Sequence, residues 1–217
     1  GGFAIHAARH YGCRVTTTTI SEAQFTEARR RIDSAGLGDR ITLLHQDYRD
    51  LEGTYDKLVS IEMIEAVGHR YLPVFFSKCN SLLKRNGTML LQAITIRDQQ
   101  FNSYMRSVDF IQRHIFPGGC LLSNDTMVEM IASKTDMVVR GLEDFGLHYA
   151  KTLQEWRQRF NTSFQTLQRL GFDERFRRLW EFYLCYCEGG FLERSISVVH
   201  LVASRPAHRE DPVFSRH

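Results

Sequence analysis

The sequence predicts an α/β protein with a mostly parallel, doubly wound sheet, and three observations point to this fold class. Short apolar runs rich in β-branched residues recur through the first half of the chain. Stretches with helix start and stop signals separate these runs. The links between them are short, which is typical of parallel βαβ units with right-handed crossovers. In an open sheet of this kind, ligands bind beyond the carboxyl ends of the strands.

Each element of the first half carries its own local signals. Gly12 ends the first predicted helix, Ser21 caps the second, and the pair Asn86-Gly87 ends the third. The runs between them are rich in Val, Ile, Thr and Leu, which favour strands. We therefore expect helices at 2–11, 21–35 and 71–84, and strands at 13–20, 40–46, 55–61 and 88–96.

The regular alternation breaks after Ile96. Residues 97–122 are unusually aromatic for a connection and end in the turn signal FPGGC. This stretch is either a lid that roofs the ligand-binding end of the sheet or an ordinary satellite core, and the sequence leaves both open. Beyond it we expect a helix at 124–134, a strand at 137–142, helices at 153–170 and 173–191, and a strand at 195–204.

Composition narrows the function classes. A chain of 217 residues that is 43% hydrophobic suits one domain, which we place at 1–205, with a polar tail at 206–217. The net charge of +3 is too small to indicate nucleic-acid binding. No apolar run approaches the roughly 18 residues that span a bilayer, and no signal peptide is visible. The five cysteines are scattered without a metal-type pair, which fits a reducing cytosol.

The segment DKLVSIEMIEAVG is the most informative part of the chain. An apolar strand there leads directly into Glu62 and Glu65. Carboxylates delivered to the ligand-binding end of a sheet are poorly solvated and can move protons or orient a polar ligand. The alternative is that both acids open a helix, where the macrodipole stabilises negative charge.

Polar residues also follow the two preceding strands. Thr19, Ser21 and Gln24 offer neutral hydrogen bonds where an NAD enzyme would place an acid, so ordinary NAD binding is disfavoured. Asp47 and Tyr48 suit an adenine, which needs an acceptor for its amino group and a ring to stack on. The alternatives are that Ser21 only caps its helix and that Asp47 only forms a turn.

Two further features have both a functional and a structural interpretation. Gly1 and Gly2 precede a helix, an arrangement that lets backbone N–H groups approach a ligand, although a linker would look the same. The late helices interleave arginines with aromatic residues, which suits an anionic membrane surface. Ordinary solvated helix faces have the same composition.

Taken in order, several motifs resemble one family. They are GGFAIHAA, TTTTISEAQ, LLHQDYRDL, VSIEMIEAVGHRY, LLQAITI, HIFPGGCLLS, FGLHYAKTL and FYLCYCEGGF. Up to about Arg205, the chain resembles the cyclopropane-fatty-acyl-phospholipid synthases and mycolic-acid methyltransferases. The resemblance implies a Rossmann-like, S-adenosylmethionine-dependent fold in which the last strand is antiparallel. It also implies methyl transfer to the double bond of an unsaturated phospholipid acyl chain, through a carbocation that a bound bicarbonate deprotonates.

The resemblance assigns roles residue by residue. Glu65 corresponds to the carboxylate that orients bicarbonate, Ile94 to a main-chain contact with it, and Tyr149 to a tyrosine that hydrogen-bonds it. Gln92 stands where many members have a histidine, and Ala66 departs from the family pattern in the same way. The implied cofactor-binding residues are Gly1, Gly2, Thr19, Ile20, Ser21, Gln24, Asp47, Tyr48 and Ile61.

The resemblance also sets expectations about the whole protein. The first residue is not a methionine, and the first strand and the start of the glycine-rich loop are expected upstream, so the chain by itself is expected to be inactive. The implied location is cytoplasmic and peripheral to the inner membrane surface, with a homodimer left open. The competing functions are a lipid-surface binding domain without activity and a methyltransferase acting on a small amine or a sterol.

Overall fold

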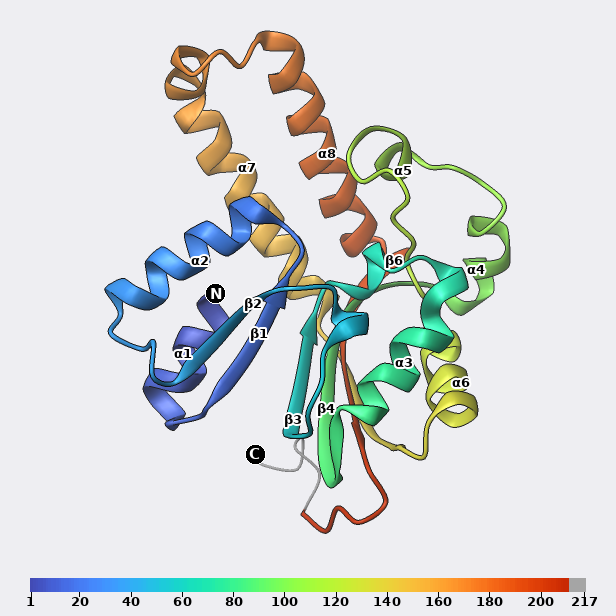
Figure 1. Ribbon diagram of the computed structural model, residues 1–217. Helices are drawn as coiled ribbons and strands as arrows, with labels where there is room; N and C mark the ends of the chain where they lie inside the picture. The colour runs from blue at the N-terminus through green and yellow to red at the C-terminus, as the bar shows by residue number, and fades with distance from the viewer. Residues whose placement is uncertain (211–217) are drawn as a thin grey trace. The chain divides into compact units, whose positions relative to one another are not determined.

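The computed structural model describes residues 1–210, and these form two compact units (Figure 1). The first unit spans Gly1–Gly53 and the second begins at Thr54. Each unit contains its own sheet, and each is described by itself below. The expectation of a single domain at 1–205 stays a prediction.

The first unit is a small α/β layer. Its elements are α1 (Gly2–Tyr11), β1 (Val15–Thr19), α2 (Glu22–Ser34), β2 (Ile41–His45) and the 3-10 turn η1 (Tyr48–Asp50). β1 and β2 pair in parallel from Val15 opposite Ile41 to Thr19 opposite His45. Small residues on both helices, including Ala4, Ala8 and Ala28, let them pack closely on Ile41 and Leu43. Gly12 ends α1 with a φ of 63°, which favours glycine.

The second unit has a four-stranded sheet in the order β3-β4-β6-β5. The strands are β3 (Tyr55–Ile61), β4 (Leu83–Ile96), β5 (Val138–Asp144) and β6 (Ile196–Ser204). β3 and β4 are parallel, whereas β6 runs antiparallel to both β4 and β5. The last strand of the chain therefore lies inside this sheet, between two strands that precede it. The predicted antiparallel last strand is confirmed.

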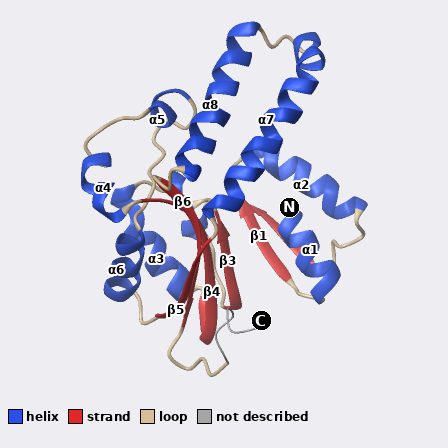
Figure 2. Cartoon of the chain, turned by 180° about the vertical axis from the view of Figure 1, so that it is seen from behind, coloured by secondary structure: helices blue, strands red, loops and turns tan. Residues whose placement is uncertain are grey.

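Helices cover this sheet on two sides. The helices are α3 (Leu72–Ser81), α4 (Asp98–Tyr104), α5 (Phe110–His114), α6 (Asn124–Lys134), α7 (Gly146–Arg169) and α8 (Glu174–Leu192), with 3-10 turns at Ile64–Ala66 (η2) and His69–Tyr71 (η3). Figures 1 and 2 show α3 and α6 beside one face of the sheet and the α7–α8 hairpin rising from its end. The base of that hairpin packs on Ile94 and Val198 through Leu153, Leu184 and Phe191.

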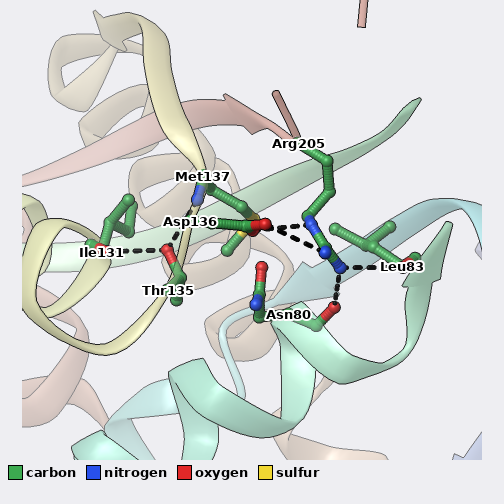
Figure 3. A network of polar contacts seen from close by, with 7 residues as sticks. All are labelled: Asn80, Leu83, Ile131, Thr135, Asp136, Met137 and Arg205. Atoms are coloured by element: carbon green, nitrogen blue, oxygen red, sulfur yellow. Dashed lines mark hydrogen bonds and ion pairs between the residues drawn. The ribbon is translucent and has the colours of Figure 1, made fainter. Parts of the chain in front are cut away.

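Arg205, just after β6, ties three segments together (Figure 3). Its Nη1 donates to the backbone oxygens of Asn80 at 2.8 Å and Leu83 at 3.1 Å. Its Nη2 and Nε reach the carboxylate of Asp136 at 3.0 and 2.6 Å. The guanidinium thus satisfies carbonyl groups at the end of α3 and fixes the chain that leads into β5.

Three predicted boundaries were wrong. The helix expected at 71–84 ends at Ser81, because Leu83 pairs with Tyr55 and starts β4. The Asn86-Gly87 pair lies in that strand, where a Cβ on Gly87 would come within 3.2 Å of the Asp56 oxygen. The helix expected to begin at 153 begins at Gly146, so Tyr149 lies on α7.

The early start of α7 has a steric cause. A Cβ at Gly146 would collide with the side chain of Ser197 on β6, so only glycine allows this approach. The Asp144 carboxylate accepts from the N–H of Gly146 at 3.1 Å and from the Ser197 hydroxyl at 2.7 Å. These contacts anchor the first turn of α7 against the sheet, which places Tyr149 over it.

Membrane-spanning and metal-binding features were sought throughout the described part of the chain. No helix within residues 1–210 combines the length and apolar character needed to cross a bilayer. Nor do the histidines, cysteines and acids of these residues gather in groups suited to a metal ion. The expected polar tail lies mostly at residues 211–217, outside the described residues.

Candidate active site

Glu62 occupies an unusual backbone position directly after β3. Its φ of 48° lies in the left-handed region, which costs a non-glycine residue about 1 kcal/mol or more. The Glu62 N–H still donates to the Gln92 oxygen at 2.9 Å, which continues the hydrogen bonding between β3 and β4. This backbone turn directs the Glu62 side chain back over β4 instead of away from the sheet.

Both oxygens of the Glu62 carboxylate accept hydrogen bonds from distant parts of the second unit. Gln92 Nε2 donates to Oε1 at 2.7 Å. The Tyr149 hydroxyl donates to Oε2 at 2.9 Å. Hydrogen bonds to a charged acceptor are among the stronger ones in proteins, so these two donors hold the carboxylate in one orientation.

A third residue, His200 on β6, extends this network. His200 Nε2 lies 2.9 Å from Gln92 Oε1, and the two residues are register partners across β4 and β6. Because Gln92 turns its amide nitrogen to Glu62, its oxygen must face His200, so His200 Nε2 donates the hydrogen. The ring of Phe145 packs on His200 with centroids 4.3 Å apart. The hydrogen bonds therefore run in one direction, from His200 through Gln92 to Glu62.

Glu65, in the 3-10 turn that follows, has a different environment. Its Oε1 accepts the N–H of Ile94 at 2.6 Å. Its Oε2 is buried and has no hydrogen-bond partner among the described residues. Burial raises the pKa of Glu65, and the nearby Glu62 charge raises it further, whereas the hydrogen bond from Ile94 opposes the shift.

Tyr149 reaches Glu62 from the second turn of α7 through an aromatic environment. Its ring stacks on Phe191 with centroids 4.7 Å apart and meets the edge of Trp156 at 6.4 Å. Burial raises the pKa of Tyr149, and the charge of Glu62 adds to the shift. The hydroxyl therefore stays protonated at neutral pH and remains a donor to Glu62.

An aromatic wall continues from this point along α8. Burial raises the pKa of Tyr183 to about 12, and the charge of Glu62 contributes. Residues of the 97–122 stretch pack on the same helix: Phe116 meets the Tyr183 ring at 6.2 Å, and Phe110 meets the Phe182 ring at 4.7 Å. The rings of this wall, Phe110, Phe116, Phe182, Tyr183 and Tyr186, come from the insertion and from α8.

The first unit contains the predicted cofactor-binding residues. A hollow of about 410 Å³ is lined by Gly1, Thr17, Thr18, Thr19, Ala23, Gln24, Glu27, Ala28, Arg31 and Leu43. A Cβ on Gly1 would approach the Cβ of Ala28 to 3.2 Å, so the backbone lies tightly against α2 there. Three predicted residues, Gly1, Thr19 and Gln24, therefore share one hollow.

The other predicted residues of this unit lie outside that lining. Ser21 caps α2 through the N–H of Gln24, and Ile20 is 74% exposed beside it. The Asp47 carboxylate binds Arg49, which lowers the Asp47 pKa. Tyr48 begins the 3-10 turn after β2, and Gly2 begins α1. A Cβ on Gly2 would meet nothing within 4 Å, so no steric need for glycine exists there.

The structure brings together only some of the predicted catalytic residues. Gln92 and Tyr149 meet at Glu62, whereas Ile94 meets Glu65. Ile61 lies on β3 opposite Gln92 and is 44% exposed. The catalytic and cofactor-binding assignments stay predictions.

Sequence reasoning gave Glu62 no specific role and missed His200. A polar residue inside the apolar run SISVVHLVAS was the available signal for His200.

The strand order and the antiparallel last strand of the second unit, with the parallel βα layer of the first, define a class I S-adenosylmethionine-dependent methyltransferase fold. The sequence model of the mycolic acid cyclopropane synthetase family matches residues 1–201. The chain belongs to this family.

Three similar proteins illustrate the match. Tuberculostearic acid methyltransferase UfaA1 of Mycobacterium tuberculosis is 39% identical over 191 residues, which cover 88% of this chain and 44% of the relative. Cyclopropane-fatty-acyl-phospholipid synthase of Escherichia coli is 34% identical over 206 residues, covering 94% and 51%. A crystal structure of mycolic acid cyclopropane synthase CmaA1 with SAH and CTAB has a TM-score of 0.85 at 24% identity, covering 94% and 74%. The chain spans about half the length of the curated relatives it matches.

Proposed function

We propose that the protein transfers a methyl group from S-adenosylmethionine to the double bond of an unsaturated phospholipid acyl chain, forming a cyclopropane ring or a methyl branch. The observation that carries this proposal is a hydrogen-bonded carboxylate, Glu62, set among aromatic side chains in a chain of this family. Aromatic faces stabilise a carbocation, and a nearby base removes its proton.

The residues of the first unit fit S-adenosylmethionine. Bound there, this cosubstrate supplies an electrophilic methyl group on a sulfonium. Gly1 directly precedes α1, where the first backbone N–H groups have no helical partner and can meet a ligand. Thr19 and Gln24 offer neutral groups for the ribose and methionine parts, and Asp47 offers an acceptor for the adenine amino group. The relative named CmaA1 is itself described with SAH.

The aromatic wall favours a long apolar substrate and disfavours a small amine as the substrate. An acyl chain needs a dry surface that excludes water from a carbocation. Rings from the insertion and from α8 provide such a surface. Tyr183 belongs to this surface, and the charge of Glu62 contributes to its raised pKa. Two relatives are named for methylation or cyclopropanation of fatty acyl groups. This favours the lid interpretation of residues 97–122.

The tip of the α7–α8 hairpin is suited to an anionic bilayer surface. Leu170 is 70% exposed and Phe172 is 40% exposed at this tip. The exposed Arg169, Arg175 and Arg178 flank them. Apolar side chains between arginines can enter the lipid interface while the charges meet anionic headgroups. We propose that the protein works at the cytoplasmic face of the membrane as a peripheral protein.

Vesicle sedimentation tests this docking surface. Leu170→Ser with Phe172→Ser should weaken binding to vesicles of anionic phospholipid about a hundredfold or more, because burying each side chain is worth about 1.5–3 kcal/mol. Leu192→Ser is the matched control, since Leu192 is 56% exposed at the other end of α8. Equal binding of all three proteins would refute the docking surface.

The resemblance also implies a bound bicarbonate as the base. The resemblance assigns the Ile94 N–H and the Tyr149 hydroxyl to bicarbonate as donors, and Gln92 stands where many members have a histidine. In the described structure Ile94 donates to Glu65, while Tyr149 and Gln92 donate to Glu62. These residues therefore do not fit a bicarbonate, and no step of the mechanism proceeds through one.

Lipid mass spectrometry tests the proposed function. The complete gene, expressed in a host that lacks its own cyclopropane synthase, should yield unsaturated chains heavier by one CH₂. A saturated methyl branch would require a hydride donor in addition, so the ring or a methylene is the product that a base alone can release. Unmodified lipids together with a methylated small amine or sterol would refute the lipid substrate. Lipid binding without any methylation would instead favour a lipid-surface binding domain.

A further inference from the structure

We propose that the Glu62 carboxylate is itself the base of the reaction and occupies the place of bicarbonate. This inference rests on the proposed function, because it names the residue that removes the proton from the methylated acyl chain. It gives a specific catalytic role to a residue to which the family resemblance had assigned none.

The first argument is that two groups that could donate hydrogen bonds to a bicarbonate already donate them to Glu62. A bicarbonate needs hydrogen-bond donors, and the Gln92 amide and Tyr149 hydroxyl present theirs to the two oxygens of Glu62. A carboxylate and a bicarbonate both present the two oxygens of a planar, negatively charged CO₂ group. Glu62 thus provides the same acceptor geometry while remaining covalently attached to the chain.

The second argument comes from the backbone. Within residues 1–210, only Glu62 and Arg194 have a positive φ without being glycine. Strain of this kind persists where surrounding contacts impose it, and it clusters at functional sites. At Glu62 the imposing contacts are those of its carboxylate, together with the N–H bond to Gln92 at 2.9 Å. The strained turn is what brings the carboxylate over β4.

The third argument separates Glu62 from Glu65. One oxygen of Glu65 is used by the backbone N–H of Ile94, and the other is buried without a partner among the described residues. Each oxygen of Glu62 accepts one hydrogen bond from a side chain, Oε1 from Gln92 and Oε2 from Tyr149. Each oxygen therefore keeps a second lone-pair position for a proton. Glu65 is a positioning residue that fixes the loop after β3 to β4.

The alkene pair of the acyl chain forms the bond to the incoming methyl carbon, and the C–S pair stays on sulfur. The neighbouring chain carbon is left positive. Glu62 then takes a proton from the new methyl group, and the C–H pair closes the third bond of the ring. The neutral carboxylic acid returns its proton to solvent, and no oxidant or reductant is needed.

The supporting residues have distinct tasks in this step. The Tyr149 hydroxyl and the Gln92 amide position Glu62, and His200 fixes which way Gln92 faces. The Tyr149 hydroxyl and the Gln92 amide are neutral donors toward the carboxylate, so they orient it without adding a fixed positive charge. A base held in this way can approach a carbocation directly.

Chemical rescue tests the proposal. Glu62→Gly, in protein expressed from the complete gene, removes the carboxylate and relieves the positive φ, so the fold should be retained. Turnover on vesicles of unsaturated phospholipid should fall about 10²–10⁴-fold. Added formate or bicarbonate should restore part of it, because Gln92 and Tyr149 are left without their acceptor. Thermal unfolding of the variant verifies that it is folded.

Two controls make the result specific. Arg194→Gly changes the other positive-φ residue to glycine and should keep full turnover without any response to formate. The unsubstituted protein should keep its turnover in buffer freed of carbon dioxide and bicarbonate.

The outcomes separate the two proposals. If the unsubstituted protein methylates lipid but needs bicarbonate, or if Glu62→Gly keeps near-normal turnover in buffer freed of carbon dioxide and bicarbonate, the role of Glu62 is refuted and the proposed function stands. A folded Glu62→Gly variant that is inactive and unresponsive to formate and bicarbonate would also count against it. If the unsubstituted protein methylates no lipid, the proposed function fails and the role of Glu62 fails with it.

Discussion

The two units of this chain build their polar sites in different ways. In the first unit, the strand-end groups bind near neighbours: Thr19 meets Gln24, and Asp47 meets Arg49. In the second unit, Glu62 is held by residues from β4 and α7, and β6 adds His200. The contacts of the first unit join residues that are near one another in the sequence. The contacts of Glu62 exist only when the whole sheet of the second unit has formed. Substitutions in them should lower the rate of the chemical step more than the affinity for the cofactor.

After Glu62→Gly, the largest effect is expected for Glu65→Gln, at about 10²-fold in turnover. Glutamine keeps an oxygen for the N–H of Ile94 but cannot carry the carboxyl group's proton or charge beside Glu62. The affinity for S-adenosylmethionine, measured by calorimetry, should change little, because its proposed residues lie in the first unit. Turnover near that of the unsubstituted protein would return Glu65 to the role of opening the 3-10 turn.

The same variant has a pH-dependent effect on stability. Burial raises the pKa of Glu65 in the folded protein above its ordinary value of 4.5. A carboxyl with a raised folded pKa stabilises the fold fully below its unfolded pKa, and this contribution is lost as pH rises through the folded pKa. Glutamine does not titrate. The free energy of unfolding of Glu65→Gln, relative to the unsubstituted protein, should therefore increase in urea titrations as the pH rises from below 4.5 through the raised pKa of Glu65.

Tyr149→Phe should lower turnover about tenfold to a hundredfold. The change removes one donor to a charged acceptor, worth about 1.5–3 kcal/mol, while the stack on Phe191 is kept. Tyr183→Phe is the matched control, because Tyr183 packs in the same cluster and makes no hydrogen bond to Glu62. An equal loss in both variants would show that the effect comes from packing. The kcat and the KM for S-adenosylmethionine distinguish the two explanations.

A smaller effect is expected from the caps of α2 and α6, one in each unit. Ser21→Ala removes the acceptor for the Gln24 N–H and should cost about 0.5–2 kcal/mol. Amide hydrogen exchange should show reduced protection of backbone amides in the first unit only. Ser123→Ala removes the corresponding cap of α6 and should loosen the second unit instead. Loss of protection throughout the chain in either variant would mean that the two units unfold together.

The smallest effect is expected for Gln92→His, which should leave the type of lipid product unchanged. Histidine can still donate a hydrogen bond toward Glu62, although it titrates near neutral pH and an amide does not. Mass spectrometry of the lipids distinguishes ring from branched products through their fragmentation. A change of product in this variant would show that position 92, and not the base beside it, decides the outcome.

The sequence predicted the elements whose signals are local. The cap at Ser21, the stop at Gly12 and the helix at Asn124–Lys134 were confirmed because each depends on neighbouring residues. The end of α3 was misplaced, since cross-strand pairing of Leu83 overrides local helix preference.

For the same reason, the partners of Glu62 could not be derived from spacing. Its contacts with Gln92 and Tyr149 join residues 30 and 87 positions apart, and only the folded sheet determines them.

The position of β6 has a consequence for the order of protein synthesis. β6 ends at Ser204 and lies between β4 and β5, which are translated earlier. A chain still attached to the ribosome therefore holds β4 and β5 without the strand that joins them, and such unpaired edges are prone to aggregation. His200 arrives with this last strand, so Gln92 gains its partner only when translation of the sheet is complete. Incomplete chains thus lack the outermost donor of the Glu62 network, and premature termination before β6 cannot release a protein with a finished site.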